Sequence, residues 1–572
     1  MLGADLKIME LISARPADIV RQCANTNIHT VSFTTPCWQA TILPMNKPLN
    51  LKTLQFDTTF TDALPGDPIL DNYTRQVGRA CYSLVKPRAF PNASLIAVSR
   101  ELVQELGLDT AYCQSTDFLN LFNGTELPDT IQSYALCYGG HQFGHWAGQL
   151  GDGRAINLGE MIGPDNRHWT LQLKGAGPTP YSRTADGLAV LRSSIREFLC
   201  SEAMHHLGIP TTRALCLLNS GEKVMRDMFY DGHPRYEPGA IVCRVAPTFI
   251  RFGNFEIFTS RQDIETLRYL ADFTIRRDFP ELTPGGPETY LAWFRNICLS
   301  TADLMIHWMR VGFVHGVMNT DNMSITGLTI DYGPYGWLDN YDPDWTPNTT
   351  DASGRRYRFG NQPMIALWNL VQLANALYPL VEQTQPFEDI LQEYKTHYEK
   401  GWLAMMKAKL GLSDAHDDDE ALIHALLQAF TLAETDMTLF FRKLADIDSL
   451  TTPHEAIAIM QEAFYAPLTS GEAEDAFLQW FFRYQQHLEK ETRPTSERVS
   501  SMNSVNPIYV LRNYLAQQAI DLAEQEDYSM IHELMAVLRS PYTHQDGKEH
   551  LSGKRPDWAR TKPGCSMLSC SS

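Results

Sequence analysis

Apolar residues recur with two different periods along the chain, and the change of period predicts where strands give way to helices. Between residues 131 and 265, short apolar runs such as "WTLQLKG" and "AIVCRVA" alternate with glycine-rich turns, which predicts strands. Between 266 and 410, the run "ICLSTADLMIHWMRVGF" has the apolar spacing of a helix. Between 411 and 540 nearly every segment is helical in pattern, for example "EALIHALLQAFTLAE". This order predicts an α+β protein with a strand-rich lobe followed by a helical lobe, and ligands commonly bind between two such units.

Composition and charge limit what such a protein can bind. The 572 residues are 44% hydrophobic and 20% charged, which is typical of globular proteins and excludes global disorder. The formal net charge of −19 argues against nucleic acid or an anionic membrane as a partner, although a local basic pocket stays compatible with it. The sequence contains no uninterrupted run of about 18 apolar residues, so it predicts no transmembrane helix. Eleven cysteines without a C-x-x-C pair, and the lack of a secretory signal, predict a cytoplasmic protein, or a mitochondrial one in a eukaryote.

The first candidate site is the glycine-rich segment "YGGHQFGHWAGQLGDGRAINLGE" at 138–160. Gly148, Gly151 and Gly153 lie within six residues, just before a predicted strand. Glycine lets backbone N–H groups approach phosphate oxygens closely, and Arg154 adds a cation at the same place. A purely structural β-turn explains these glycines equally well.

Two further residues have the arrangement of an ATP clamp. Lys174 ends a strand-like run after the glycine loop, a position that suits phosphate binding. Glu197 lies in "RSSIREFLCSEAMHHLGIP" at 192–210, which predicts a helix. An ion pair between Lys174 and Glu197 would order the cleft as it does in protein kinases. A solvent-facing lysine and a surface helix are the alternatives.

The most specific segment is "HGVMNTDNMSITGLTIDYGPYG" at 315–336. Asn322 follows His315 by seven residues, the spacing that separates the catalytic-loop histidine and the metal-binding asparagine of protein kinases. Asp331 opens "DYG" after an apolar run, as the metal-binding aspartate opens D-F-G. An amide and a carboxylate that converge on a cleft offer hard oxygen ligands, which suit magnesium.

The same segment lacks the kinase base. Val317 stands two residues after His315, where kinases have the aspartate that accepts the hydroxyl proton, and a valine cannot accept a proton. Asp321, directly before Asn322, is the nearest carboxylate in the sequence. The pattern predicts a protein that binds Mg-ATP and whose phosphotransfer base has been moved or lost.

On these motifs the sequence resembles the selenoprotein O family, pseudokinases that act as protein adenylyltransferases. The resemblance runs from about Met45 to the C-terminus, through "YGGHQFG", "AGQLGDGRA", "LQLKGAG", "TPYSR", "LRSSIREFL", "HGVMNTDNMSITGLTIDYGPYG", "NQPMIALWNL", "NPIYVLRNYLAQQAI" and the terminal "CSS". It implies a protein-kinase-like two-lobe fold with a helical C-terminal extension. It also implies a flipped ATP, whose α-phosphate faces the protein substrate.

The hydrophobic pattern, the composition and the resemblance together divide the chain. The expected segments are a weakly structured extension at 1–44, a family-specific N-terminal segment at 45–130, a kinase-like N-lobe that binds nucleotide phosphates at 131–265, a kinase-like C-lobe with the metal and catalytic loop at 266–410, a helical C-terminal region at 411–540 and a flexible tail with a redox cysteine at 541–572. One departure from the family is a longer predicted hairpin at 226–239.

Carried over residue by residue, the resemblance assigns a set of nucleotide-binding positions. They are Gly151, Gly153, Arg154, Lys174, Asp186, Gly187, Arg244 and Arg251, with Glu197 as the partner of Lys174. From the residues alone, Arg244 and Arg251 in "CRVAPTFIRFG" are better interpreted as surface strand residues, so their role depends on the resemblance. The resemblance assigns Asp321 as the proton acceptor, and Asn322 and Asp331 as the ligands of Mg²⁺ or Mn²⁺.

The implied activity is transfer of AMP from ATP to Ser, Thr or Tyr hydroxyls of protein substrates, with release of pyrophosphate. UMP transfer from UTP is a variant of the same reaction. Two alternatives stay open: a protein or small-molecule phosphotransferase whose base is Asp321, and an inactive ATP-binding scaffold.

The C-terminal "GCSMLSCSS" holds Cys570, at the place where some relatives have selenocysteine. We therefore expect a redox role for Cys570, and redox proteins among the partners. Pro347 stands where some relatives have the cysteine that pairs with it, which makes Cys565 the nearest candidate partner.

Overall fold

Nine strands form one antiparallel sheet within the residues that the computed structural model describes, which are 56–228, 230–414, 416–468, 471–565 and 567–569. From one edge to the other the strands are β2 (Tyr82–Leu84), β4 (Tyr134–Leu136), β7 (Ala155–Ile162), β8 (His168–Lys174), β11 (Arg235–Ala246), β10 (Arg213–Arg226) and β3 (Ser94–Val98). In addition, β1 (Phe56–Asp57) pairs with β7, and β9 (Ala189–Val190) pairs with β11. The fold is therefore mixed α and β, as the hydrophobic pattern predicts.

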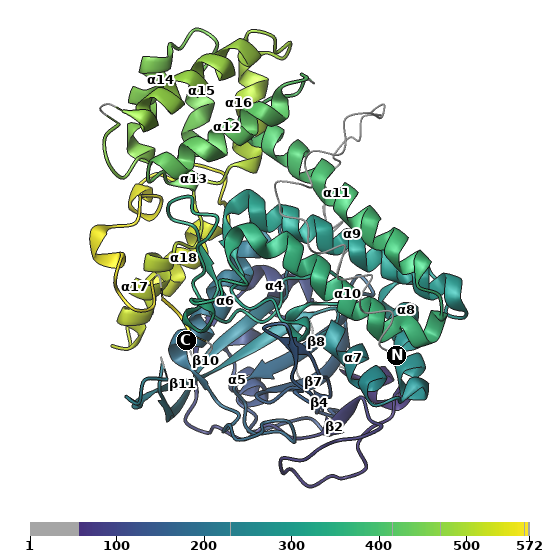
Figure 1. The fold of residues 1–572 in the computed structure, drawn as a ribbon. Helices are drawn as coiled ribbons and strands as arrows, with labels where there is room; N and C mark the ends of the chain where they lie inside the picture. The colour runs from purple at the N-terminus through teal and green to yellow at the C-terminus, as the bar shows by residue number, and fades with distance from the viewer. Residues whose placement is uncertain (1–55, 229, 415, 469–470, 566, 570–572) are drawn as a thin grey trace.

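Helices cover both faces of the sheet and form most of the chain that follows it (Figure 1). The helices used below are α4 (Arg100–Glu105), α5 (Thr116–Phe122), α6 (Leu191–His206), α7 (Phe252–Ser260), α8 (Ile264–Asp278), α9 (Pro287–Val311), α10 (Gln362–Val381), α11 (Gln385–Leu410), α12 (Asp419–Leu432), α13 (Met437–Lys443), α14 (Pro453–Ile459), α15 (Glu472–Leu488), α16 (Thr495–Val505), α17 (Asn513–Ala523) and α18 (Ser529–Leu538).

The alternation of side chains along β11 shows why the central strands are buried on both faces. Cys243 belongs to the apolar cluster that α4 and α5 complete on one face of the sheet. Val242 belongs to the cluster that α6 completes on the other face. Because successive strand residues point to opposite faces, Arg244 lies on the α6 face. The "AIVCRVA" pattern thus carries a buried arginine rather than a surface one, and Arg244 is 2% exposed.

The segment 45–130 contributes more to this sheet than the sequence predicts. Its strand β3 pairs with β10 at one edge, and β2 pairs with β4 at the other. These strands have only three and five residues, too few for a period-2 pattern to be visible. The sheet is completed by the N-terminal segment and is not confined to 131–265.

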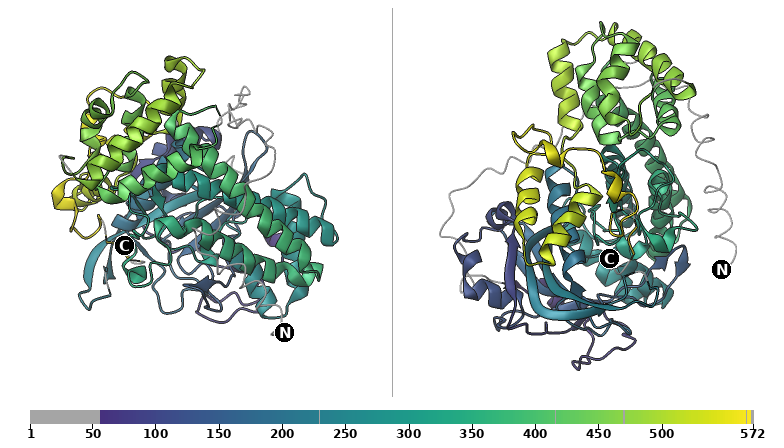
Figure 2. Two further views of the ribbon diagram at one scale, coloured as in Figure 1. Left: turned by 45° about the horizontal axis from the view of Figure 1, so that its top comes forward. Right: turned by 90° about the vertical axis from the view of Figure 1, so that its left-hand side faces the viewer.

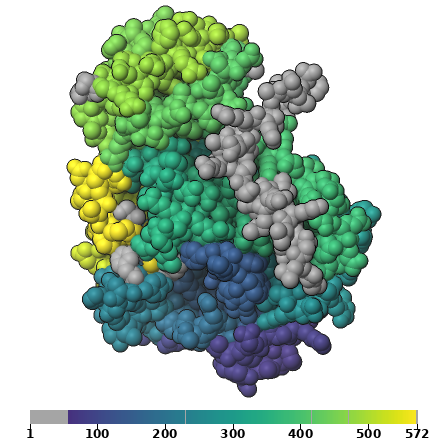
Figure 3. All heavy atoms as spheres, in the orientation of Figure 1, coloured from purple at the N-terminus to yellow at the C-terminus, as the bar shows by residue number. Residues whose placement is uncertain are grey.

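The expected helical region at 411–540 divides into two groups in space. Helices α12 to α16 share their own hydrophobic cluster with the end of α11. Helices α17 and α18 instead return to the main core and pack against α6. In the right-hand view of Figure 2 and in Figure 3 the first group forms the top of the molecule, and the yellow C-terminal segment lies below it.

The described residues of the C-terminal segment are packed, which differs from the flexible tail that the sequence predicts. Leu551, Ala559, Cys565 and Leu568 are buried. The Leu568 N–H donates to the carbonyl of Pro347 at 2.9 Å. The polar, Gly-, Pro- and Ser-rich composition hides these few apolar anchors.

Several expectations fall outside the part of the chain that the structure describes. They concern residues 1–44 and Cys570. Cys565, the candidate disulfide partner of Cys570, is described. Burial raises the pKa of the Cys565 thiol to about 11, so little thiolate is present at neutral pH.

The segment Phe359–Val381, which contains α10, is long and apolar enough to cross a membrane, although the sequence shows no uninterrupted apolar run. In the described structure 67% of its apolar 18-residue window is buried. It packs against α7, α9 and α11, so its apolar surface is accounted for by the protein core.

Candidate functional site

A cavity of about 670 Å³ brings together residues from the sheet and from the segment 317–334. Eleven of the residues singled out from the sequence line it: Gly151, Gly153, Arg154, Lys174, Asp186, Gly187, Arg244, Arg251, Asp321, Asn322 and Asp331. Glu197 lies behind Lys174, as its ion-pair partner. Residues separated by up to 180 positions in the sequence therefore share one cavity.

The cavity is positively charged within an acidic chain. Among the described residues, six cationic side chains line it, against four carboxylates, a difference of two positive charges in a chain whose formal net charge is −19. Two of the cations, Arg183 and Arg226, were missed in the sequence. Arg226 opens the long hairpin predicted at 226–239, and it donates to both carboxylate oxygens of Asp186 at 2.7 Å. A basic residue at the start of an insertion was the available signal.

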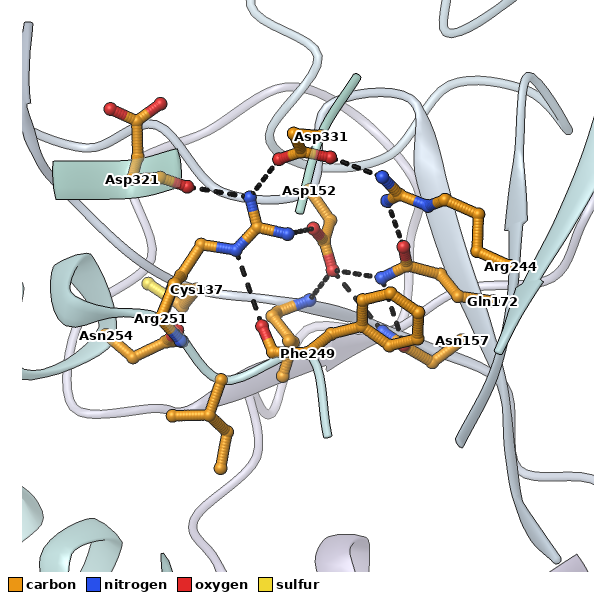
Figure 4. A network of polar contacts seen from close by, with 12 residues as sticks. Cys137, Asp152, Asn157, Gln172, Arg244, Phe249, Arg251, Asn254, Asp321 and Asp331 are labelled. Atoms are coloured by element: carbon orange, nitrogen blue, oxygen red, sulfur yellow. Dashed lines mark hydrogen bonds and ion pairs between the residues drawn. The ribbon is translucent and has the colours of Figure 1, made fainter. Parts of the chain in front are cut away.

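A row of polar side chains crosses three strands beneath the cavity (Figure 4). Arg244 on β11 is the cross-strand partner of Gln172 on β8, which is in turn the partner of Asn157 on β7. Arg244 donates to Gln172 Oε1, and Gln172 Nε2 donates to Asn157 Oδ1 at 3.0 Å. Cross-strand partners lie on the same face of a sheet. The strand register therefore places Arg244 in the site.

Lys174 lies on that same face, two residues further along β8. Its Nζ is 2.5 Å from Glu197 Oε2 of α6, so the predicted ion pair is present. Glu197 also accepts from Arg244 Nη1 at 3.1 Å. Burial lowers the pKa of Lys174, and the Glu197 carboxylate opposes that shift. The other carboxylate of the helix, Glu202, instead binds Arg213 at 2.8 Å, away from the cavity.

Asp331 is held between two guanidinium groups (Figure 4). One of its oxygens accepts from Arg244 and the other from Arg251. Burial alone would raise the pKa of Asp331, but Arg251, Arg244 and Lys174 hold it well below its usual range. Its φ of 59° lies in the left-handed region, which costs a non-glycine residue about 1–2 kcal/mol. This strained backbone conformation occurs at the residue whose carboxylate binds both arginines.

Asp321 has the opposite electrostatic environment. Its Oδ1 is buried without a hydrogen-bond partner among the described residues, and its Oδ2 accepts from Gln142 Nε2 at 3.2 Å. Arg251 binds the backbone carbonyl of Asp321 at 2.8 Å, while the carboxylate points away from that guanidinium (Figure 4). Burial raises the pKa of Asp321 to about 7. A carboxylate with that pKa is suited to accept a proton near neutral pH.

Asn322 and Asp331 offer the oxygen ligands expected for a divalent cation. Asn322 Nδ2 donates to the carbonyl of Val317 at 2.9 Å, so the amide oxygen is the atom left to face a cation. An amide oxygen and a carboxylate fit Mg²⁺ or Mn²⁺. Asp331 would exchange its arginine contacts for the cation in part, since each of its oxygens now has one guanidinium partner.

Two glycines of the site are required by their surroundings. Gly151 has a φ of 76°, and a Cβ there would lie 2.4 Å from the Tyr181 ring. Gly187 has a φ of 74°, and a Cβ there would lie 2.2 Å from the carbonyl of Gly177. Both therefore have a structural role while also lining the cavity, and for Gly151 this is the alternative that the sequence left open.

Gln142, which the sequence did not single out, positions Asp321 from the hairpin of β5 (His141–Gln142) and β6 (His145–Trp146). Its hydrogen bond lowers the pKa of Asp321. We expect Gln142→Leu to raise the pKa of Asp321. The decrease of kcat/KM toward acidic pH, which follows protonation of Asp321, should then begin at a higher pH, with ATP affinity unchanged. The control is His145→Gln on the exposed strand of the same hairpin. Profiles that coincide in all three proteins would contradict this role.

Lys174 should contribute directly to nucleotide affinity. A charge-assisted hydrogen bond is worth about 1.5–3 kcal/mol, so we expect Lys174→Met to raise the Kd for ATP about 10- to 100-fold. The matched control is Lys223→Met, an exposed lysine on β10 of the same sheet. Titration calorimetry measures both Kd values. Equal Kd values for the two variants would show that Lys174 does not contribute to ATP binding.

Comparison with known proteins agrees with this geometry. A family model described as protein adenylyltransferase SelO matches residues 70–539. A protein of Rhodopirellula baltica named protein nucleotidyltransferase YdiU is 57% identical over 538 residues, covering 91% of this chain and 99% of that protein. Proteins of the same name from Aromatoleum aromaticum and Flavobacterium johnsoniae are 57% and 53% identical, each covering 91% of this chain and 100% of the relative.

Proposed function

The chain belongs to the SelO family of protein adenylyltransferases, and from this premise we propose that its cavity is where AMP passes from ATP to a hydroxyl of a protein substrate. The enzyme is a nucleotidyltransferase that transfers AMP to proteins. One observation carries the assignment of the site. A positively charged cavity holds two carboxylates with opposite properties, Asp331 paired with two arginines and Asp321 with a pKa of about 7.

In the proposed mechanism the cationic residues bind and orient the nucleotide. Lys174, Arg244 and Arg251 neutralise the phosphates, and planar guanidinium groups match phosphate oxygens well. Asn322 and Asp331 would hold Mg²⁺ or Mn²⁺, which neutralises charge on the polyphosphate when bound.

The chemical step requires one base. Asp321 accepts the proton of the substrate hydroxyl as the hydroxyl oxygen forms a bond to the α-phosphorus. The bond between the α-phosphorus and the bridging oxygen to the β-phosphate breaks, and pyrophosphate leaves with that oxygen. Asp321 lines the cavity, and its buried Oδ1 has no hydrogen-bond partner among the described residues, which supports this role.

The proposal includes a protein-kinase-like arrangement of two lobes with a helical C-terminal extension. Three features support it: an antiparallel sheet that carries Lys174, a helix that carries its partner Glu197, and a following helical part that carries Asn322 and Asp331. The cavity is lined from both parts.

Labelled ATP tests the reaction. With the label on the α-phosphate, protein from a cell lysate should become labelled, and with the label on the γ-phosphate it should not. The reverse pattern would establish a phosphotransferase, and no transfer with either label would favour a scaffold. Proteome-wide mass spectrometry for AMP adducts, with Asp331→Ala as the inactive control, then identifies the substrates and the modified hydroxyl type.

A further inference from the structure

Three potential metal ligands meet at the part of the sheet formed by β1, β7 and β8, on residues that do not line the nucleotide cavity. Asp57 and Glu160 are direct cross-strand partners, and His168 stands opposite Ile162, two residues beyond Glu160. Alternation along the strands puts these three side chains on one face. His168 Nδ1 lies 3.5 Å from Asp57 Oδ2 and 4.0 Å from Glu160 Oε2, and one ligand atom from each residue lies within 4.8 Å of the others.

Two of these atoms are buried and lack a hydrogen-bond partner in the described part of the chain. They are Glu160 Oε2 and His168 Nδ1. Glu160 is only 1% exposed, so water does not readily satisfy its oxygen. Leaving a buried polar group unsatisfied costs about 1–3 kcal/mol, so a ligand that binds both atoms would recover that free energy.

The local charge also favours a cation. The other oxygen of Glu160, Oε1, accepts from Arg277 of α8, and Arg277 also donates to Asp278 at 3.0 Å. Burial raises the pKa of Glu160 to about 7, Arg277 opposes that shift, and the carboxylates of Asp278 and Asp57 add to it. A divalent cation would supply positive charge to this group of carboxylates. Arg277 would act as the outer partner that orients a ligating carboxylate.

We infer that Asp57, Glu160 and His168 form a second divalent-metal site, selective for zinc or a similar borderline ion, that fastens β1 to the sheet. One imidazole with two carboxylates suits such an ion better than calcium or magnesium. Ligand atoms of a tetrahedral zinc lie about 3.3–3.6 Å from one another. The distances of 3.5 Å and 4.0 Å from His168 Nδ1 to the Asp57 and Glu160 oxygens therefore require only small side-chain movements. The His168 side chain is 35% exposed, which provides a path for the ion to enter.

The site should be structural, because none of its three ligands lines the cavity. A ligand that binds only the folded protein stabilises it. Zinc should therefore raise the melting temperature of the chelator-treated full-length enzyme. It should do so equally in Asp331→Asn, whose substitution lies in the nucleotide site.

The experiment is calorimetric titration of chelator-treated protein with zinc chloride, together with thermal melts with and without zinc. We expect His168→Gln and Glu160→Gln each to bind one zinc equivalent fewer than the wild type and to lose the rise in melting temperature. His233→Gln, an exposed histidine on the β10–β11 hairpin, is the matched control and should retain both.

His168→Gln is the decisive variant, because its partly exposed side chain can be replaced without opening the core. Its melting temperature without zinc should lie close to that of the chelator-treated wild type. If it binds as many zinc equivalents as the wild type, or if zinc does not stabilise the wild type, the site is not a metal site.

Discussion

Asp331→Asn should abolish AMP transfer while ATP binding persists. Asparagine keeps the shape of the side chain but removes the anionic ligand of the divalent cation, whose loss should cost several kcal/mol at the transition state, or about a 10³-fold lower kcat. The same change removes the Asp331 carboxylate from Arg251 and from Arg244, which keeps its contact with Glu197, and it makes the cavity more positive by one charge. Single-turnover transfer from α-labelled ATP and calorimetric Kd values measure the two effects separately.

The matched control for that variant is Asp344→Asn. Asp344 is an exposed carboxylate that also pairs with an arginine, Arg358, at 2.9 Å, but it does not line the cavity. It should transfer AMP at the wild-type rate. Near-normal transfer by Asp331→Asn at limiting Mg²⁺ would refute the metal-ligand assignment.

Asp321→Asn should lower kcat about 10²- to 10⁴-fold with little change in the Kd for ATP, because a base acts in the chemical step. The pH dependence gives a second signature. Only the deprotonated carboxylate accepts a proton, and burial raises the pKa of Asp321 to about 7. The kcat/KM of the wild type should therefore fall about tenfold per pH unit below 7 and level off above it. The residual activity of Asp321→Asn should lack this acidic limb.

A different pattern would assign Asp321 another role. If Asp321→Asn lost ATP affinity while the rate at saturating ATP was unchanged, Asp321 would be a nucleotide or metal ligand. If the acidic limb remained in the variant, another group would supply the titration near pH 7. Gln142→Leu tests the same carboxylate through its hydrogen-bond donor. That variant should shift the acidic decrease of kcat/KM to higher pH, whereas Asp321→Asn should remove it.

Local pattern was sufficient for the elements that carry the site. The helix predicted at 192–210 is α6, and Lys174 does end a strand. The spacing of Asn322 and Asp331 places both in one cavity. These features could be predicted because a strand end, a helix face and a short loop depend mainly on residues that are neighbours in the sequence.

Charge partners were less accessible to sequence reasoning. Arg244 and Arg251 were interpretable from the residues alone only as surface strand positions, yet they are 2% and 1% exposed and share Asp331. Gln142 gave no signal in the sequence, and Arg226 gave only that of a basic residue at the start of the long predicted hairpin. A buried arginine and a solvent-facing one look alike in a pattern of polar and apolar letters, because the difference depends on a carboxylate far along the chain.

The amino-acid sequence by itself determined the alternation of strands and helices, the glycine loop and the absence of a kinase base at Val317. It made the Lys174–Glu197 pair one of two interpretations, and the structure contains that pair. Only the tertiary structure decided the environments of the two carboxylates. Asp331 has a lowered pKa because two arginines, from β11 and from the loop after it, contact its carboxylate. Asp321 has a raised pKa because it is buried, and its Oδ1 has no hydrogen-bond partner in the described part of the chain. The tertiary structure likewise brought Asp57, Glu160 and His168 together. Desolvation and charge pairing depend on distances in space. Strand register and packing determine these distances, and the order of residues alone does not give them.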